Sequence, residues 1–134
     1  MDDPFTVPIE VRFRDIDSMG HVNNAVYATY LEQARSRYYR NVIGVRLDRV
    51  RTVLARMEIE YRRPIDLDQP VTVALWTRDL GESSLDLAYE VRADGEVAAT
   101  AETVQVVVDN EGTESRPIPA EWRERIAEHG DERT

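Results

Sequence analysis

The sequence predicts one α+β domain in which a five-stranded antiparallel sheet packs against a single long helix. Three observations support this prediction. Apolar and polar residues alternate in five separate segments, which is typical of half-buried strands. Between the first two segments the apolar spacing becomes helical, and the connections between the later segments are too short for parallel crossovers. The 134 residues suit one domain, spanning 1–134.

The first predicted strand runs from Phe5 to Phe13, because every odd position in this segment is apolar. Pro8 lies inside the segment. Proline has no N–H to donate to a neighbouring strand, so this strand is expected at an edge of the sheet.

The long helix is predicted to start near Ala25 and to run for about eighteen residues. Asn23 or Asn24 can cap its N-terminus, and Gly44 can adopt the left-handed conformation that ends it. Its apolar face is formed by residues spaced three or four apart, namely Tyr27, Tyr30, Leu31, Ala34 and Tyr38.

Four further strands are predicted, around residues 53–61, 71–75, 85–91 and 97–108. The dipeptide Asp94-Gly95 predicts a tight hairpin turn between the last two strands. The apolar positions of the final strand change phase near Thr103, which predicts a β-bulge there.

The long helix covers only part of the predicted sheet, so other segments or chains must cover the rest. A short helix is expected around residues 121–128, docked through Trp122 and Ile126. One long helix cannot cover both faces of a five-stranded sheet, and the predicted outward face carries Trp76 and Leu54. We therefore expect further burial through oligomerisation.

The chain is acidic and contains no cysteine. Twenty-six acidic residues against 17 basic ones give a formal net charge of −9, which disfavours nucleic acids and anionic membranes as partners. The lack of cysteine excludes disulfides, thiolate zinc sites and cysteine nucleophiles. The sequence starts with acidic residues where a signal peptide has basic ones, and no apolar run reaches membrane-span length, so a cytoplasmic location is expected.

The densest group of polar residues is RDIDSMGHVNN at 14–24, between the first strand and the long helix. The free backbone N–H groups of a first helical turn lie at the positive end of the helix dipole and can stabilise an oxyanion. A carboxylate held nearby by a glycine-containing turn can act as base or nucleophile on a carbonyl placed between them.

The alternative for this segment is a purely structural role, with aspartates in Asx turns, asparagines as helix caps and His21 as an exposed side chain. A calcium loop starting at Asp15 is excluded, because its fifth and twelfth positions are Met19 and Val26. No metal site is predicted. Serine–histidine–acid catalysis is also disfavoured, since no G-x-S-x-G motif occurs and the second histidine, His129, lies in an acidic tail.

The string DIDSMGHVNNAVY at 15–27, followed by YLE at 30–32 and AR at 34–35, resembles the signature of acyl-CoA thioesterases of the 4-hydroxybenzoyl-CoA thioesterase family. The resemblance implies a hotdog fold, in which the five-stranded antiparallel sheet wraps around one long central helix, here with a short C-terminal helix added. It implies hydrolysis of an acyl-CoA thioester to a carboxylic acid and free CoA, without metal or cofactor. It also implies a homodimer joined sheet edge to sheet edge, often paired again as a homotetramer.

The resemblance also implies roles for single residues. Asp17 matches the catalytic carboxylate, which acts as general base or nucleophile, and Asn24 matches the position whose backbone N–H binds the oxyanion. In the related plant acyl-carrier-protein thioesterases an Asp-x-Asn-x-His arrangement maps onto Asp17 and His21, with Met19 in place of the asparagine. His21 is therefore a candidate for polarising the substrate or orienting water. Tyr27 also matches a family position, although its place on the apolar helix face already explains it.

Nine arginines against three acidic residues lie between Arg35 and Arg63, an excess that suits an anionic ligand. Arg62 and Arg63 are the candidates for contacting the phosphates of CoA, because guanidinium groups match phosphate oxygens. The alternative is that these arginines only solvate the surface. The alternative function is a non-catalytic acyl-CoA-binding hotdog protein. A hotdog dehydratase or hydratase would need a different acid–base pattern.

Overall fold

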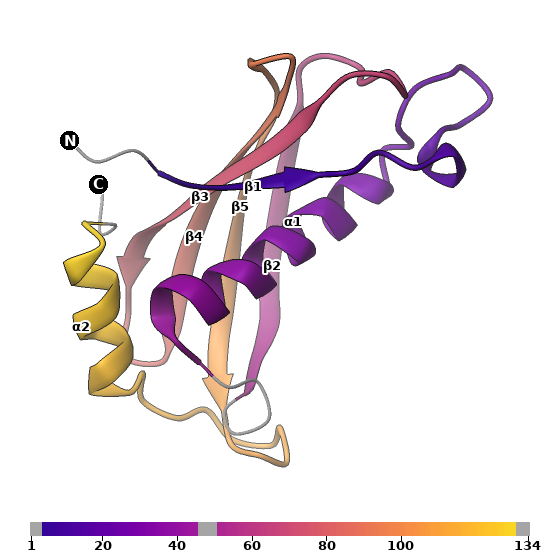
Figure 1. The fold of residues 1–134 in the computed structure, drawn as a ribbon. Helices are drawn as coiled ribbons and strands as arrows, with labels where there is room; N and C mark the ends of the chain where they lie inside the picture. The colour runs from indigo at the N-terminus through magenta and orange to yellow at the C-terminus, as the bar shows by residue number, and fades with distance from the viewer. Residues whose placement is uncertain (1–3, 46–50, 131–134) are drawn as a thin grey trace.

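The computed structural model describes residues 4–45 and 51–130 as one α+β domain (Figure 1). Its five strands are antiparallel and lie in the order β1-β3-β4-β5-β2. Helix α1 (Val26–Tyr38) crosses one face of the curved sheet. The predicted hotdog architecture is therefore confirmed. The strands are β1 (Phe5–Ile9), β2 (Arg51–Tyr61), β3 (Val71–Leu80), β4 (Ser84–Ala93) and β5 (Glu96–Val108).

Strand β1 is shorter than the alternation predicts. It ends at Ile9, which pairs with Val71, the first residue of β3, so the chain has no further strand to pair with beyond that point. Residues 13–15 form a 3₁₀ turn, and Phe13 is 80% exposed. The expected edge position of Pro8 is confirmed, since β1 pairs only with β3.

The long helix has the predicted length and ends. Helix α1 continues as one π-helical turn through Ile43, and Gly44 follows in the left-handed conformation with a φ of 77°. At the N-terminus, the side-chain oxygen of Asn23 accepts the backbone N–H of Ala25 at 2.9 Å, so Asn23 is the capping asparagine. The predicted apolar face is buried against the sheet.

Polar side chains are buried between α1 and the sheet. The hydroxyl of Tyr38 bonds to that of Thr77 at 2.7 Å, and the hydroxyl of Tyr89 bonds to that of Thr103 at 2.7 Å. Thr103 faces the helix because the inward alternation of β5 continues unbroken to Val107, and its hydroxyl gives the buried Tyr89 a polar partner. The predicted bulge near Thr103 is wrong, because the register of β5 against β4 shifts between residues 97 and 99 instead.

Strand β2 forms the second edge of the sheet and is exposed along most of its length (Figure 1). The prediction that Leu54 faces outward is wrong. A register shift after Leu54 turns its side chain toward α1, where it lines a small hollow together with Met57 and Arg35. Trp76 lies half-buried on the outer side of β3.

Strand β3 extends to Leu80, five residues beyond its predicted end, whereas the hairpin turn and the C-terminal helix follow the predictions. Asp94 and Gly95 form the β4–β5 hairpin turn with φ values of 54° and 78°. Helix α2 (Ala120–Glu128) buries Trp122 and Ile126, and it packs beside the C-terminal end of α1 (Figure 1). None of the helices in the described ranges is long and apolar enough to cross a membrane.

Candidate functional site

The loop between β1 and α1 holds Asp17 in a defined orientation. The Oδ1 atom of Asp17 accepts the backbone N–H groups of Met19 at 2.9 Å and His21 at 3.3 Å. Its own N–H donates to the carbonyl of His21 at 2.8 Å, and Gly20 closes the turn with a φ of 82°. The second carboxylate oxygen, Oδ2, has no hydrogen-bond partner among the described residues.

Asp15 anchors the same loop to the helix. Its Oδ2 accepts the hydroxyl of Tyr30 at 2.7 Å and the N–H of Arg12 at 2.9 Å. Its carbonyl accepts the N–H of Asn23 at 2.8 Å. Burial and the neighbouring carboxylate raise the pKa of the Tyr30 hydroxyl, which therefore stays protonated and donates to Asp15. Asp15 has a structural role.

One pocket of about 310 Å³ is lined by all five candidate catalytic and substrate-binding residues, namely Asp17, His21, Asn24, Arg62 and Arg63. Its walls come from the loop after β1, from the N-terminus of α1 and from the end of β2. The pocket residues are Asp17, Met19, His21, Val22, Asn24, Tyr27, Tyr61, Arg62, Arg63 and Pro64.

Asn24 lines this pocket and has a free backbone donor. Its N–H has no acceptor within the ranges that the structure describes, and it lies directly before the first turn of α1. Its carbonyl accepts the hydroxyl of Tyr61 at 2.9 Å, which ties the end of β2 to the start of the helix. Tyr27 is buried, and its ring packs edge-on against Tyr61 at 5.0 Å between centroids.

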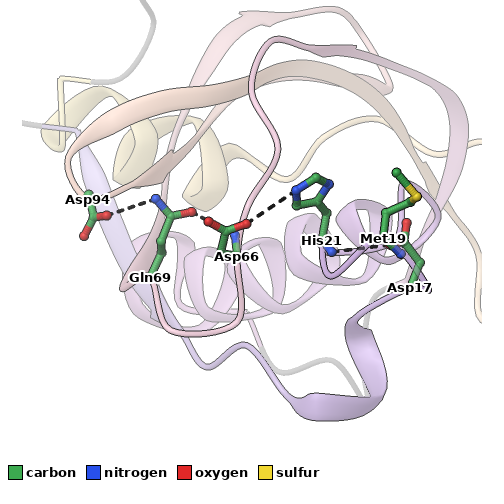
Figure 2. A network of polar contacts seen from close by, with 6 residues as sticks. All are labelled: Asp17, Met19, His21, Asp66, Gln69 and Asp94. Carbon is green, nitrogen blue, oxygen red and sulfur yellow. Dashed lines mark hydrogen bonds and ion pairs between the residues drawn. The ribbon is translucent and has the colours of Figure 1, made fainter.

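His21 is held through its backbone, and its side chain faces an acidic partner. Figure 2 shows its imidazole turned toward Asp66, while its backbone N–H faces Asp17. The Nε2 atom of His21 lies 3.6 Å from Oδ1 of Asp66. The two residues also form an isolated antiparallel bridge, beside which Val22 donates to the carbonyl of Ile65 at 2.8 Å.

The two arginines differ in their side-chain partners. The backbone N–H groups of Arg62 and Arg63 both donate to the carbonyl of Ala98, at 2.8 and 3.0 Å. The guanidinium of Arg63 is ion-paired with Glu96. Within the described chain, the guanidinium of Arg62 has no partner.

The arginine-rich segment does not form one surface. Arg37 and Arg40 line a separate hollow of about 560 Å³ along the C-terminal half of α1, whereas Arg62 and Arg63 lie at its N-terminal end. Two of the nine arginines, at positions 46 and 49, lie outside the described residues. The described arginines of this segment are therefore spread over separate surfaces, and only Arg62 and Arg63 line the pocket with Asp17.

The sequence did not predict Tyr61, which lines the pocket, or Asp66, which contacts His21 from outside it. The alternation of β2 places Tyr61 on the inward face, but pairing with β5 at the far edge is what brings it to Asn24. Asp66 lies in a loop whose sequence carries no motif. Among the described residues, no three histidine, aspartate or glutamate side chains come together as a metal site.

Comparison with known proteins gives consistent matches over most of the chain. The model of the thioesterase-like superfamily matches residues 11–126. A thioesterase from Thermus thermophilus, crystallised with coenzyme A and zinc, aligns with a TM-score of 0.83 and 41% identity, over 95% of this chain and 94% of that one.

Two relatives also match at the sequence level. The long-chain acyl-CoA thioesterase FadM of Escherichia coli K12 is 28% identical over 123 residues, covering 88% of this chain and 93% of FadM. The uncharacterised protein YsmA of Bacillus subtilis strain 168 is 30% identical over 105 residues, covering 77% of this chain and 71% of YsmA. The family match includes the loop after β1, helix α1 and the end of β2, which together form the pocket. The chain therefore belongs to the thioesterase-like superfamily.

Proposed function

We propose that this protein is an acyl-CoA thioesterase, which hydrolyses an acyl thioester to a carboxylic acid and free CoA. The observation that carries the proposal is the convergence of Asp17, His21, Asn24 and two arginines on one pocket at the N-terminus of α1. The names of FadM and of the Thermus thermophilus thioesterase, together with the coenzyme A in that crystal, support the choice of substrate.

Asp17 is the reacting carboxylate in this proposal. Two backbone N–H groups hold its Oδ1, which leaves Oδ2 directed by the loop and open to a reactant. As a general base, Oδ2 takes a proton from water while the water oxygen attacks the thioester carbon. As a nucleophile, Oδ2 attacks the same carbon and water then hydrolyses the resulting anhydride. In both routes the C–S bond breaks, and the departing thiolate takes a proton.

The oxyanion formed on the carbonyl is stabilised by the N–H of Asn24. This donor has no protein acceptor in the described ranges, and it lies at the positive end of the α1 dipole. A free donor that is already oriented costs no reorganisation when negative charge develops, and one such donor contributes about 10² to 10³-fold to the rate.

Arg62 and Arg63 provide the positive charge for the CoA phosphates in this proposal. Both side chains are exposed at the rim of the pocket, where a long anionic substrate can lie partly in solvent. Guanidinium groups suit this task because their paired N–H donors match phosphate oxygens.

A homodimer joined through β2, or a homotetramer built from two such dimers, is part of the proposal. Strand β2 is an eleven-residue free edge that exposes several large apolar side chains, whereas monomeric proteins usually keep such an edge short. Pairing two β2 strands would satisfy their free backbone groups and cover Val53, Leu54, Met57 and Tyr61.

The test measures CoA release from a panel of aliphatic and aromatic acyl-CoA esters, with a thiol reagent, for the wild type and Asp17→Asn. The chain contains no cysteine, so the protein adds no background to the assay. The wild type is expected to cleave some of the esters, and Asp17→Asn to lose at least about 10²-fold in kcat while remaining folded. Asp68→Asn, an exposed aspartate outside the pocket, is the matched control and should retain full activity.

Two results would each contradict one part of the proposal. Binding of acyl-CoA without cleavage of any ester would favour the non-catalytic acyl-CoA-binding alternative. Full activity in Asp17→Asn would leave the thioesterase assignment intact but remove Asp17 from the reaction. Parallel assays with acyl carrier protein thioesters decide which carrier the enzyme accepts.

A further inference from the structure

We propose that Asp66, in the loop between β2 and β3, is a positioning residue that sets the orientation of the His21 imidazole in the pocket. This inference rests on the proposed thioester hydrolysis. Asp66 does not itself line the pocket, and nothing in the sequence motif of residues 15–27 points to it.

The backbone of Asp66 is held from two directions. On one side it forms the antiparallel bridge to His21. On the other side its N–H donates to the side-chain oxygen of Gln69 at 2.8 Å. The amide nitrogen of Gln69 in turn donates to Oδ2 of Asp94 at 2.9 Å, in the β4–β5 hairpin turn. Figure 2 shows this row of side chains leading from Asp94 through Gln69 and Asp66 to His21.

These hydrogen bonds fix the backbone position of Asp66. The remaining freedom of its carboxylate is rotation about its own side-chain bonds. Its Oδ1 lies 3.6 Å from Nε2 of His21, within ion-pair range and longer than a hydrogen bond. Such contacts in ligand-free sites often shorten when substrate binds. The exposed location means that this contact adds little to stability, so its value lies in orientation.

The contact has a chemical consequence for His21. A carboxylate facing Nε2 favours the imidazole form with a proton on Nε2, which leaves Nδ1 as a hydrogen-bond acceptor. In Figure 2 the second ring nitrogen lies on the side of Met19, which also lines the pocket. Nδ1 of His21 is thereby prepared to accept a hydrogen bond from water beside Asp17.

The experiment compares Asp66→Ala with Asp68→Ala, which removes the same charge from the same loop at a residue outside the network. In Asp66→Ala, kcat should fall about tenfold with KM changed less than about twofold, a part of the ~10² to 10⁴-fold that general acid–base catalysis contributes. Asp66→Asn keeps an acceptor oxygen and should recover part of the loss. Asp68→Ala should match the wild type.

A second readout is independent of activity. The chain has two histidines, so the imidazole N–H signals in a ¹⁵N-edited spectrum can be assigned with a His21→Asn variant. A His21 Nε2–H signal should appear in the wild type and Asp68→Ala and disappear in Asp66→Ala.

The inference fails if Asp66→Ala and Asp68→Ala give the same kcat, or if the Nε2–H signal survives in Asp66→Ala. In those cases ester hydrolysis by the wild type would still support the proposed function. If the wild type hydrolyses no ester while the signal still depends on Asp66, the proposed function fails and the contact is only structural.

Discussion

The two oxygens of the Asp17 carboxylate differ: Oδ1 is hydrogen-bonded to its own loop, whereas Oδ2 has no partner among the described residues. The bond from Met19 to Oδ1 is that of an Asx turn, so Asp17 has the structural role expected of a turn aspartate, and Oδ2 is left for the proposed reaction. Because the N–H groups of Met19 and His21 orient the carboxylate, a change in the backbone of this turn should lower kcat.

Gly20→Ala tests this dependence. The φ of 82° at Gly20 is strained for any residue with a Cβ, although a Cβ there would meet no atom within 4 Å. We expect a loss of about 1 kcal/mol in the free energy of unfolding and a clear fall in kcat. Gly112→Ala, at φ 75° with equally open surroundings, is the matched control and should lose similar stability with unchanged kcat. Denaturant unfolding and steady-state kinetics measure both quantities, and equal kcat in the two variants would contradict the prediction.

The two rim arginines should contribute unequally to CoA binding. Arg63 already pairs with Glu96, whereas the guanidinium of Arg62 has no partner in the described structure. Arg62→Ala should raise KM for acyl-CoA roughly fivefold, about 1 kcal/mol, and Arg63→Ala should raise it less. Glu96→Gln, which releases Arg63, should lower KM. Acyl-pantetheine lacks the CoA phosphates and is the control substrate. A similar KM increase with acyl-pantetheine would show that Arg62 does not act on phosphate.

At the scale of elements, the outer face of the sheet carries two carboxyl groups close together. Burial and the adjacent Glu102 raise the pKa of Asp86 to about 6. Oδ1 of Asp86 is buried without a hydrogen-bond partner. Glu102 is ion-paired with Arg78 at 3.0 Å and Arg56 at 3.7 Å, so Asp86 is the member of the pair that holds the proton.

This arrangement predicts a pH-dependent stability. An acid whose pKa is higher in the folded state binds more protons when folded, so its contribution to the free energy of unfolding falls as pH rises from its ordinary value of 3.8 to about 6. Asp86→Asn removes the ionisation and should be more stable than the wild type at pH 8, with a smaller advantage at pH 4. Thermal unfolding at the two pH values measures this. An advantage that is equal at both, or larger at pH 4, would contradict the assignment.

At the scale of the whole molecule, the two edge strands of the sheet, β1 and β2, differ in how well they suit pairing with another strand. Strand β1 is short and contains Pro8, features that prevent further pairing at that edge. Strand β2 is long and has exposed apolar residues, features that favour it. The asymmetry is the physical basis for proposing assembly through β2.

Val53→Glu tests the assembly, since Val53 is 44% exposed on β2 and lies outside the pocket. A buried pair of negative charges at a two-fold interface is strongly unfavourable. The variant should sediment with the mass of a single 15.4 kDa chain, whereas the wild type should show at least about twice that mass. Leu67→Glu introduces the same charge at a residue 38% exposed in the β2–β3 loop and is the control. A wild type that sediments as a single chain would rule out the proposed dimer.

The sequence by itself determined the features that depend on near neighbours. Helix α1 and its ends, the Asp94-Gly95 hairpin and the docking residues of α2 follow from local spacing, capping and turn chemistry. The loop that carries Asp17 and Asn24 could be identified in the same way, because both residues lie within a short segment that ends at a helix N-terminus.

Only the tertiary structure decided which distant segments meet that loop. Pairing of β2 with β5 at the far edge of the sheet brings Tyr61 to Asn24, and the loop that follows brings Asp66 to His21. The inward direction of Thr103 likewise follows from the register of β5 against β4, which also brings its hydroxyl to Tyr89. Strand order and hydrogen-bond partners depend on packing between residues far apart in the chain, which local periodicity does not predict.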